Sequence, residues 1–200
     1  MDATQWDSRY ATADLVWSAE PNRFLTAEVA GLAPGRALDV ACGEGRNAIW
    51  LATAGWTATG VDFSAVALDK ARRLAASRGV EVEWVLSDVV AYFDDPHEFD
   101  LVAVFYLQLP PPARRAVLSG AARAVAPGGR LLVVAHDSSN LERGYGGPQE
   151  PSVLYRPEDV VADLADALEI EKAEVVERPV STDEGERVAL DLLVRAVRPL

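Results

Sequence analysis

The stretch that decides the fold is Leu38–Ala48, which reads LDVACGEGRNA. It begins inside the short apolar run Arg36–Val40 and ends inside Asn47–Ala54, whose pattern is helical. Glycines at such a turn let the backbone bend tightly and approach a ligand without a Cβ in the way. The stretch therefore predicts a strand, a ligand-binding glycine loop and a helix at the start of an α/β sheet.

The same alternation of strand and helix continues along the chain. Apolar runs predict further strands, and amphipathic segments bounded by glycine or proline predict the helices between them. The expected strands are Thr57–Val61, Glu81–Leu86, Phe99–Phe105 and Arg130–Ala135. The expected helices are Pro21–Leu32, Ala65–Arg78, a segment that opens at Pro110–Pro112 and extends through Val125, and Pro157–Leu168.

The C-terminal part departs from this alternation. Glu171–Val180 and Val188–Val197 both read as strands, and the segment 181–187 between them leaves no room for a helix. Two strands joined in this way form an antiparallel hairpin. We therefore predict an α/β fold with a doubly wound, Rossmann-like, seven-stranded sheet that is mostly parallel and carries a C-terminal antiparallel β-hairpin.

Length and composition favour a single domain over residues 1–200. Half of the 200 residues are apolar and a quarter are charged, which is ordinary for a globular chain. This length supports one large core and is short for two full domains. We expect residues 1–33 to form a helical lid segment and residues 36–200 to form the Rossmann-like core.

The formal net charge of −12 bears on the partners of the protein. An acidic surface repels phosphate backbones and anionic lipids, although one basic cleft is compatible with an acidic average. The longest apolar runs fall far short of the roughly 20 residues that span a bilayer. We therefore expect a small-molecule partner, and neither nucleic acid nor a membrane.

Cysteine content and the first residues indicate a compartment. The start, MDATQWDSRYATADL, lacks the basic residues and apolar run of a signal peptide. The single cysteine, Cys42, excludes a disulfide within the chain and fits a reducing compartment, so we expect a cytoplasmic protein. The histidines and acids show no metal-ligand spacing, and we expect no bound metal. The sequence does not indicate an oligomeric state.

The glycine loop alone leaves two kinds of ligand open. Gly43-x-Gly45-x-x-Ala48 satisfies the dinucleotide fingerprint, and Asp62 lies near the spacing of its ribose-binding acid. A NAD-type oxidoreductase is therefore one hypothesis.

Three features favour S-adenosylmethionine (SAM) instead. Asp39, four residues before the first glycine, is awkward beside a pyrophosphate but suits a ligand that carries an ammonium and a sulfonium cation. Asp88 follows the third strand and could accept a hydrogen bond from an adenine amino group. Finally, a terminal antiparallel hairpin is not expected of a six-stranded parallel dinucleotide domain.

Five segments, in this order, resemble the successive motifs of class I SAM-dependent methyltransferases. They are ALDVACGEGRNAIWLA (37–52), VDFS (61–64), SDV (87–89), FDLVAVFYLQL (99–109) and APGGRLLVVAH (126–136). The resemblance covers roughly residues 36–137. Two outer segments, WDSRYA (6–11) and GGPQEPSVLYRPEDV (146–160), are similar to bacterial small-molecule methyltransferases of the tellurite-resistance type.

The resemblance implies a cofactor site for SAM and its product S-adenosylhomocysteine (SAH). It implies that Asp62 accepts hydrogen bonds from the ribose hydroxyls, that Phe63 packs on the adenine and that Phe105 lies beside the methionine moiety. The implied cofactor-binding residues are Asp39, Ala41, Cys42, Gly43, Gly45, Asn47, Asp62, Phe63, Ser87, Asp88, Val89 and Phe105.

Acceptor residues follow from the position of the pocket in this family. Tyr106 and Gln108 come just after the fourth strand, and Tyr10 and Trp17 precede the sheet. The N-terminal aromatics, with Trp6, are either core residues of an N-terminal helix or a lid. The segment 137–155 is long and glycine- and proline-punctuated, so it is either a functional lid or a surface excursion.

The expected reaction is an in-line displacement at the sulfonium methyl, which mainly requires alignment and exclusion of water. A hydroxyl or amine acceptor needs proton removal, for which Tyr106 and His136 are candidates. His136 could equally be a polar cap of its strand, His97 reads as exposed loop, and Cys42 as a small buried residue and not a nucleophile. A SAM- or SAH-binding module without catalysis is an alternative.

Overall fold

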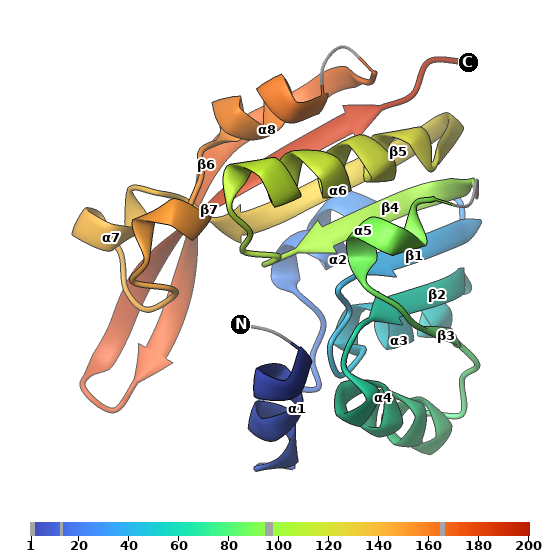
Figure 1. The fold of residues 1–200 in the computed structure, drawn as a ribbon, viewed down its shortest axis with the longest axis horizontal. Coiled ribbons are helices and arrows are strands. Elements are labelled where there is room, and N and C mark those ends of the chain that lie inside the picture. Colours follow the sequence, from blue (N-terminus) through green and yellow to red (C-terminus); the bar gives the residue numbers. More distant parts are fainter. Residues whose placement is uncertain (1–2, 13, 95–97, 165–166) are drawn as a thin grey trace.

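The protein folds around one seven-stranded sheet (Figure 1) with the strand order β3-β2-β1-β4-β5-β7-β6. The structure is a computed structural model that describes residues 3–12, 14–94, 98–164 and 167–200. Strands β1 to β5 pair in parallel, and β7 runs antiparallel to both β5 and β6, which confirms the predicted fold class. The strands are β1 Arg36–Val40, β2 Thr57–Asp62, β3 Glu83–Leu86, β4 Phe99–Phe105, β5 Val125–His136, β6 Glu169–Thr182 and β7 Gly185–Val197.

Helices cover both faces of the sheet. α5, α6 and α8 pack on one face, and α2 and α3 pack on the other. The helices are α1 Ala3–Ala11, α2 Arg23–Val29, α3 Arg46–Thr53, α4 Ala65–Ser77, α5 Val89–Tyr92, α6 Pro111–Arg123, α7 Asn140–Arg143 and α8 Pro157–Leu164, with a short 3-10 helix η1 at Pro151–Val153. Among the described residues, none of these helices has the length and apolar character needed to cross a bilayer.

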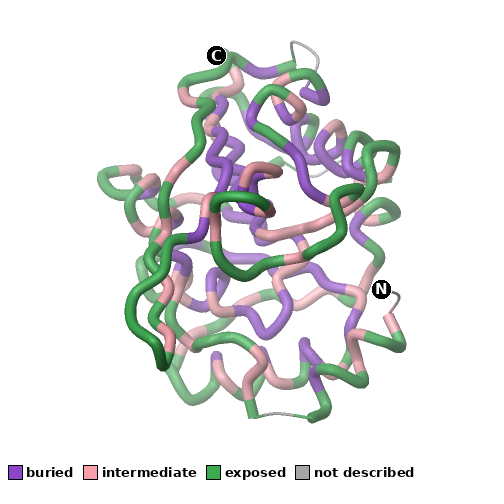
Figure 2. The backbone as a smooth tube through the Cα atoms, turned by 90° about the vertical axis from the view of Figure 1, so that its left-hand side faces the viewer, coloured by how far each residue is buried: buried purple, intermediate pink, exposed green. Residues whose placement is uncertain are grey.

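The central strands are apolar on both sides because both of their faces are covered. In β4, Val102 and Val104 enter the core under α6, whereas Leu101, Ala103 and Phe105 enter the core under α2 and α3. This explains why FDLVAVF is a nearly continuous apolar run. Figure 2 shows the buried residues in the middle of the fold and the exposed ones along its outer loops.

The topology places ligands at one edge of the sheet. The chain passes from β1 outward to β2 and β3, then returns to β4 on the other side of β1. In sheets of this kind, ligands bind outside the carboxyl ends of the strands, at the point where the strand order reverses. The candidate site therefore lies at the ends of β1 and β4, beside the glycine loop.

The predicted helix through Val125 was wrong at its C-terminal end. α6 ends at Arg123, and Val125 already pairs with Phe99 as the first residue of β5. The segment Pro127–Gly129 then forms an irregularity inside β5 instead of ending a helix. Gly129 is needed there, because a Cβ on it would lie 2.9–3.1 Å from three backbone carbonyl oxygens.

Other predicted boundaries also differ: α2 spans Arg23–Val29 instead of Pro21–Leu32, and β3 begins at Glu83 instead of Glu81. α8 ends at Leu164, not at Leu168, which is buried just ahead of β6. The hairpin strands are longer than predicted, since Thr182 pairs with Gly185 across a two-residue turn. The segment 137–155, expected to be irregular, contains α7 and η1. The predicted exposure of His97 lies outside the described residues.

Candidate active site

The glycine loop has a left-handed backbone at three positions. Ala41, Gly43 and Gly45 have φ values of 55°, 54° and 79°. Gly45 caps α3, and a Cβ on it would overlap the ring of Trp84. A Cβ on Gly43 would lie 2.8 Å from the hydroxyl oxygen of Tyr10. Both glycines are therefore required by close packing, Gly45 against Trp84 and Gly43 against Tyr10.

Asp62 ends β2 and holds two loops together. Its Oδ2 accepts a hydrogen bond from the Gly43 amide at 2.8 Å, and its Oδ1 accepts one from the Ser64 amide at 2.9 Å. Burial raises the pKa of Asp62 above its ordinary value, although these amides favour its charged form. Each carboxylate oxygen can accept more than one hydrogen bond, so capacity remains for two ribose hydroxyls.

Asp39 lies inside β1, next to the glycine loop. Its Oδ2 accepts a hydrogen bond from the Ala48 amide at 3.1 Å. Burial raises the pKa of Asp39 to about 7, although this hydrogen bond and the charge of Arg46 oppose the change. The carboxyl therefore loses its proton most easily when a cation lies beside it.

The raised pKa of Asp39 makes a prediction about stability. A carboxyl whose pKa is raised on folding contributes stability below its unfolded pKa, near 3.9, and loses it as the pH rises through about 7. In the ligand-free wild type, the carboxyl of Asp39 should therefore lower the unfolding free energy by a few kcal/mol between pH 5 and pH 8. Asp39→Asn should remove this part of the pH dependence. Urea unfolding at both pH values measures this difference. Asp69→Asn, at an exposed carboxylate on α4, is the control, and identical pH profiles for Asp39→Asn and the wild type would contradict the prediction.

Asp88 follows β3 and forms the N-cap of α5. Its Oδ1 accepts hydrogen bonds from the amides of Val90 at 2.8 Å and Ala91 at 3.4 Å. The residue is exposed, whereas Val89 beside it is buried. Ser87 donates its hydroxyl to the Asp88 carbonyl at 3.0 Å, which fixes the turn. The carboxylate is thus held at the sheet edge, where the sequence predicted it.

The remaining predicted cofactor residues lie around the same edge. Phe63 is half-buried, and Phe105 is buried at the end of β4. Asn47 is buried, and its Oδ1 accepts a hydrogen bond from the Asn22 amide at 2.9 Å, so it anchors the start of α2. Burial raises the pKa of the Cys42 thiol well above its ordinary value, which opposes a nucleophilic role.

The N-terminal segment closes over the glycine loop. Asp7 of α1 accepts hydrogen bonds from the Ser64 hydroxyl at 2.5 Å and from the Val66 amide at 3.4 Å, at the start of α4. Tyr10 is buried, and its ring stacks on the ring of Trp6 with 5.4 Å between the two ring centroids. The aromatics of α1 are therefore both packing residues and a cover for the loop.

Glu44, between the two glycines of the loop, fastens the chain that follows α1. Its carboxylate accepts hydrogen bonds from the amides of Val16 at 3.0 Å and Trp17 at 3.1 Å, and it pairs with Lys70 at 3.2 Å. Trp17 itself is 42% exposed, and the guanidinium of Arg9 lies 5.2 Å from its ring centroid. The glycine loop and the N-terminal segment are thus directly coupled.

A second group of polar side chains lies where the carboxyl ends of β4 and β5 meet the middle of the β6–β7 hairpin. We call Asn22, Tyr106, His136, Arg178 and Asp191 the acceptor cluster. Asp191 is fully buried, and its Oδ2 accepts hydrogen bonds from the Tyr106 hydroxyl and from Nε of Arg178, both at 2.7 Å. Nδ1 of His136 lies 3.1 Å from Oδ1 of Asp191, without the alignment of a hydrogen bond. Nδ2 of Asn22 donates to the Tyr106 hydroxyl at 3.4 Å.

Tyr106 is held in an unusual conformation. Its φ of 54° is rare for a residue with a bulky side chain and is found mostly at functional positions. Burial and the nearby charge of Asp191 raise the pKa of Tyr106 above its ordinary value. A tyrosine that donates its proton to a buried carboxylate is a poor base, which leaves His136 as the candidate for proton removal.

Two further features border the cluster. A Cβ on Gly147 would lie 3.0 Å from the ring of His136, so the segment after α7 covers this histidine closely. Asn140 ties the same segment to β7, because its Oδ1 accepts a hydrogen bond from the Leu190 amide at 2.7 Å. Both amide atoms of Gln108 are buried and have no hydrogen-bond partner among the described residues. Buried side-chain amides usually have a hydrogen-bond partner, which makes Gln108 a candidate ligand contact.

A cavity of about 630 Å³ lies elsewhere, between α4 and the amino ends of β2 and β3. None of the predicted cofactor or acceptor residues lines this cavity. Within the described ranges, no three His, Cys, Asp or Glu side chains come together as a metal site.

Sequence reasoning missed several residues of this edge. Glu44 and Arg46 lie inside the glycine motif, but the motif allows any residue at these two positions. Asp191 had a signal, because it interrupts the apolar run VALDLLV of β7 and a buried charge needs a partner. Arg178 and Asn22 had none, since their neighbours are distant in the sequence.

The comparison with known protein families indicates the class of protein to which this site belongs. A family described as "Methyltransferase domain" matches residues 37–129, which include the glycine loop, β1 to β4 and α6. Over these residues, the chain contains the methyltransferase domain of that family.

Several known methyltransferases are similar to the chain in sequence. The 2-heptyl-1-hydroxyquinolin-4(1H)-one methyltransferase of Mycobacteroides abscessus is 29% identical over 125 residues, which is 61% of this chain and 55% of that protein. The chain spans about half the length of the curated relatives it matches first.

Two solved structures share the fold at lower identity. The N-methyltransferase NodS from Bradyrhizobium japonicum, in complex with SAH, has a TM-score of 0.74 and 20% identity, and the match covers 99% of this chain and 98% of NodS. TehB from Haemophilus influenzae has a TM-score of 0.73 and 15% identity, covering 98% and 66%. The fold of this methyltransferase is therefore shared over nearly its full length.

The residues at the ends of β1, β2 and β3 fit SAM. Gly43 and Gly45 adopt left-handed backbone conformations that shape the loop beside these strand ends. Asp39, Asp62 and Asp88 present three carboxyl groups along one edge, where SAM has cations, ribose hydroxyls and an adenine amino group as matching partners.

Proposed function

We propose that this chain is an active enzyme that transfers the methyl group of SAM to a small-molecule acceptor. The observation that carries the proposal is the order of polar groups along the sheet edge. Asp39 and Asp62 lie at the ends of β1 and β2, and Asp88 follows β3. Tyr106 and His136 lie at the ends of β4 and β5, beside Asp191 of β7. A cofactor site and a separate acceptor site thus lie side by side.

The cofactor half of the site would use the residues predicted from the sequence. Asp62 would accept from the ribose hydroxyls, Asp88 from the adenine amino group, and Phe63 would pack on the adenine ring. Asp39 would face the cationic end of SAM, which is consistent with a pKa of about 7 that a neighbouring cation lowers. SAM supplies an already activated methyl group when it is bound.

The acceptor half would align the nucleophile for in-line displacement and exclude water. Tyr106 would hold the acceptor by its ring and hydroxyl, while Asp191 fixes the position of that hydroxyl. Gln108 would supply a hydrogen-bonding amide. His136 would take the proton of a hydroxyl or amine acceptor, and a soft anion would need no base.

The proposed partner and cellular compartment of the protein rest on its relatives, its net charge and its cysteine content. We propose a small-molecule acceptor, in line with the relative that is named as a quinolone methyltransferase. A net charge of −12 opposes nucleic acid and anionic membranes as partners, and the single cysteine is consistent with the cytoplasm.

Calorimetry and turnover test the proposal together. Titration of the purified protein with SAM, SAH and NADH should give binding of the first two only. SAM should then be converted to SAH with members of a panel of thiol, hydroxyl and amine acceptors. Binding of NADH alone would support the oxidoreductase, whereas SAH binding without any turnover would support a non-catalytic binding module.

A further inference from the structure

The charges within the acceptor cluster balance, because it contains one arginine and one carboxylate. Within it, Arg178 and the fully buried Asp191 form an ion pair with an N–O distance of 2.7 Å. Burial opposes the charge of Asp191, but His136 and Arg178 together lower its pKa below the ordinary value, so it remains a carboxylate. Arg178 and Asp191 therefore offset each other, and any further cation facing the cluster leaves it positive.

Arg46 is that further cation. It is the first residue of α3 and is partly buried, yet its guanidinium makes no hydrogen bond or ion pair with any residue that the structure describes. Burial lowers the pKa of Arg46 below its ordinary value, but a guanidinium stays charged in proteins. An unpaired and partly desolvated arginine is costly, and a bound anion would remove that cost.

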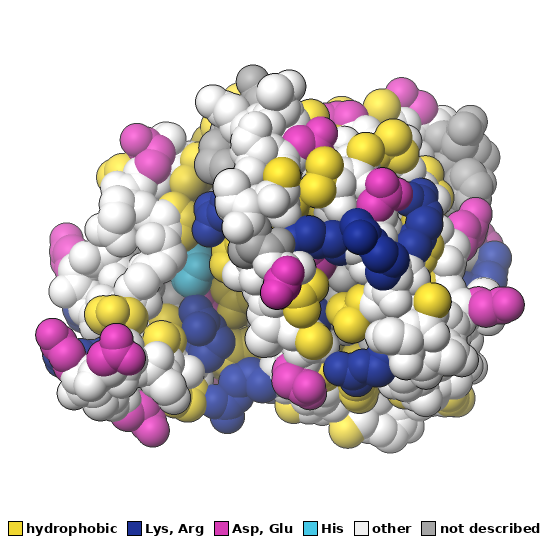
Figure 3. Space-filling view, turned by 90° about the horizontal axis from the view of Figure 1, so that it is seen from below, with side chains coloured by type: hydrophobic (Ala, Val, Ile, Leu, Met, Phe, Trp, Pro, Cys, Tyr) yellow, Lys and Arg dark blue, Asp and Glu magenta, His cyan; other side chains and the backbone are white. Residues whose placement is uncertain are grey.

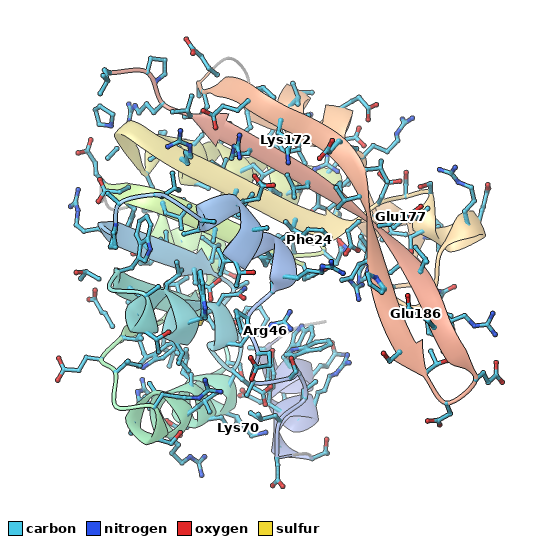
Figure 4. The ribbon with its side chains drawn as sticks, turned by 180° about the vertical axis from the view of Figure 1, so that it is seen from behind. Phe24, Arg46, Lys70, Lys172, Glu177 and Glu186 are labelled. Carbon is cyan, nitrogen blue, oxygen red and sulfur yellow. The ribbon has the colours of Figure 1, made fainter. Side chains whose placement is uncertain are left out.

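Arg46 and the acceptor cluster belong to one site. The next residue, Asn47, binds the Asn22 amide, and the Asn22 side chain binds the Tyr106 hydroxyl. Besides burial, the like charge of Arg178 lowers the pKa of Arg46, whereas Asp39 and Glu44 raise it, so Arg178 lies within electrostatic reach of Arg46. In Figure 4, Arg46 stands between Phe24 of α2 and the helix α1, on the side that faces the hairpin.

The nearby acids offset the charge of Arg46 only in part. Glu44 is engaged by Lys70 and by two backbone amides of the N-terminal segment. Asp39 is buried in β1, accepts from the Ala48 amide, and has a pKa of about 7, so it carries only part of a charge near neutral pH. The space between Arg46 and Arg178 is therefore positive within a protein whose net charge is −12.

We infer that the methyl acceptor is an anion whose carboxylate, or a similar oxyanion group, binds between Arg46 and Arg178. This inference rests on the proposed function and names the substrate class of its site. A guanidinium binds planar oxyanions through two parallel hydrogen bonds, which also orients the ligand. Figure 3 shows a hollow between the hairpin side and the α1 side of the molecule, in which basic side chains and a histidine gather.

Matched pairs of acceptors test the inference. Mercaptobenzoate against mercaptobenzamide, protocatechuate against its amide and anthranilate against anthranilamide differ in charge but hardly in shape. Each compound is titrated into the SAH-loaded protein, and each is assayed for methylation with SAM. At least one carboxylate should bind at least tenfold more tightly than its amide, because the amide cannot make the charged hydrogen bonds.

Variants then assign the preference to the arginine. Arg46→Gln should lose most of the discrimination between carboxylate and amide, and Arg46→Lys should retain part of it. Arg72→Gln, at an exposed arginine of α4, is the matched control and should behave as the wild type. Arg46 is preferred to Arg178 as the test, because substitution of Arg178 would leave Asp191 buried without its partner.

A second arm separates the acceptor from the cofactor as the source of the carboxylate. SAH carries a carboxylate and methylthioadenosine does not. If Arg46→Gln weakens SAH binding tenfold and leaves the affinity for methylthioadenosine unchanged, Arg46 binds the cofactor carboxylate. That result would overturn the inference. Equal binding of carboxylates and amides would also overturn it, as would the absence of binding by every carboxylate at millimolar concentration. Methylation of neutral acceptors alone would overturn the inference and support the proposed function. Anion binding that depends on Arg46, without any turnover, would support the anion site and contradict the proposed function.

Discussion

Replacing Asp62 by alanine should lower the affinity for SAM at least tenfold. The carboxylate organises the site, since it accepts from the Gly43 and Ser64 amides and keeps capacity for the ribose hydroxyls. Hydrogen bonds to a charged group contribute about 1.5–3 kcal/mol each, and about 1.4 kcal/mol corresponds to a tenfold change. Isothermal titration of SAM and SAH into wild type and variant measures the effect.

The control for this substitution is Asp69→Ala, at an exposed carboxylate on α4 whose partner is Arg72 on the same surface. It should leave SAM affinity unchanged. Asp62→Asn keeps one acceptor oxygen, so its loss should fall between those of the wild type and the alanine variant. If Asp62→Ala is folded by circular dichroism and binds SAM as the wild type does, the assignment of Asp62 to the ribose is wrong.

Deleting residues 1–18 should reduce methyl transfer by roughly a hundredfold or more, while SAH affinity changes by less than tenfold. The deletion removes Asp7, Tyr10, Val16 and Trp17, which cover the glycine loop, but it leaves the three carboxyl groups of the cofactor half in place. Methyl transfer depends strongly on alignment and on exclusion of water, which a cover provides. Initial rates with SAM, set against calorimetric SAH affinities, separate the two effects.

A point substitution tests the same coupling without truncation. Glu44→Ala removes the carboxylate that holds Val16 and Trp17, so it should reduce turnover in the same direction as the deletion, with less risk of unfolding. Glu20→Ala, at an exposed glutamate paired weakly with Arg78, is the control. Amide exchange should show residues 1–20 and 138–155 gaining protection when SAH binds. A truncated protein that keeps its full rate would show that the acceptor pocket is closed by other residues.

Much of the sheet was predictable because its signals are local. Each parallel strand is a short apolar run, and glycine, proline or a capping residue marks the ends of most helices. The carboxyl ends of such strands meet at one edge, so Asp39, Asp62 and Asp88 could be placed together from their positions in the chain alone. Their roles toward SAM remain predictions, whereas their common location is confirmed.

The error at Val125 shows the limit of local signals. Val117, Ala121 and Val125 have helical spacing, but pairing of Val125 with Phe99 on β4 outweighs this preference. A helix can be assigned from spacing within a few turns, whereas the start of a strand depends on the partner to which it hydrogen-bonds.

By itself, then, the sequence determined the α/β class, the terminal hairpin, the glycine loop and the cofactor edge, because each depends on residues close together in the chain. Only the tertiary structure decided the composition of the acceptor cluster and the placement of Arg46. Tyr106 and Asp191 are 85 residues apart in sequence, and their 2.7 Å hydrogen bond exists because β5 pairs with β7 in one register, which sets His136 opposite Asp191. A shift of one residue in that register would turn the carboxylate to the opposite face of the sheet. The charge of the acceptor pocket is therefore a property of strand pairing, which no local pattern in the sequence records.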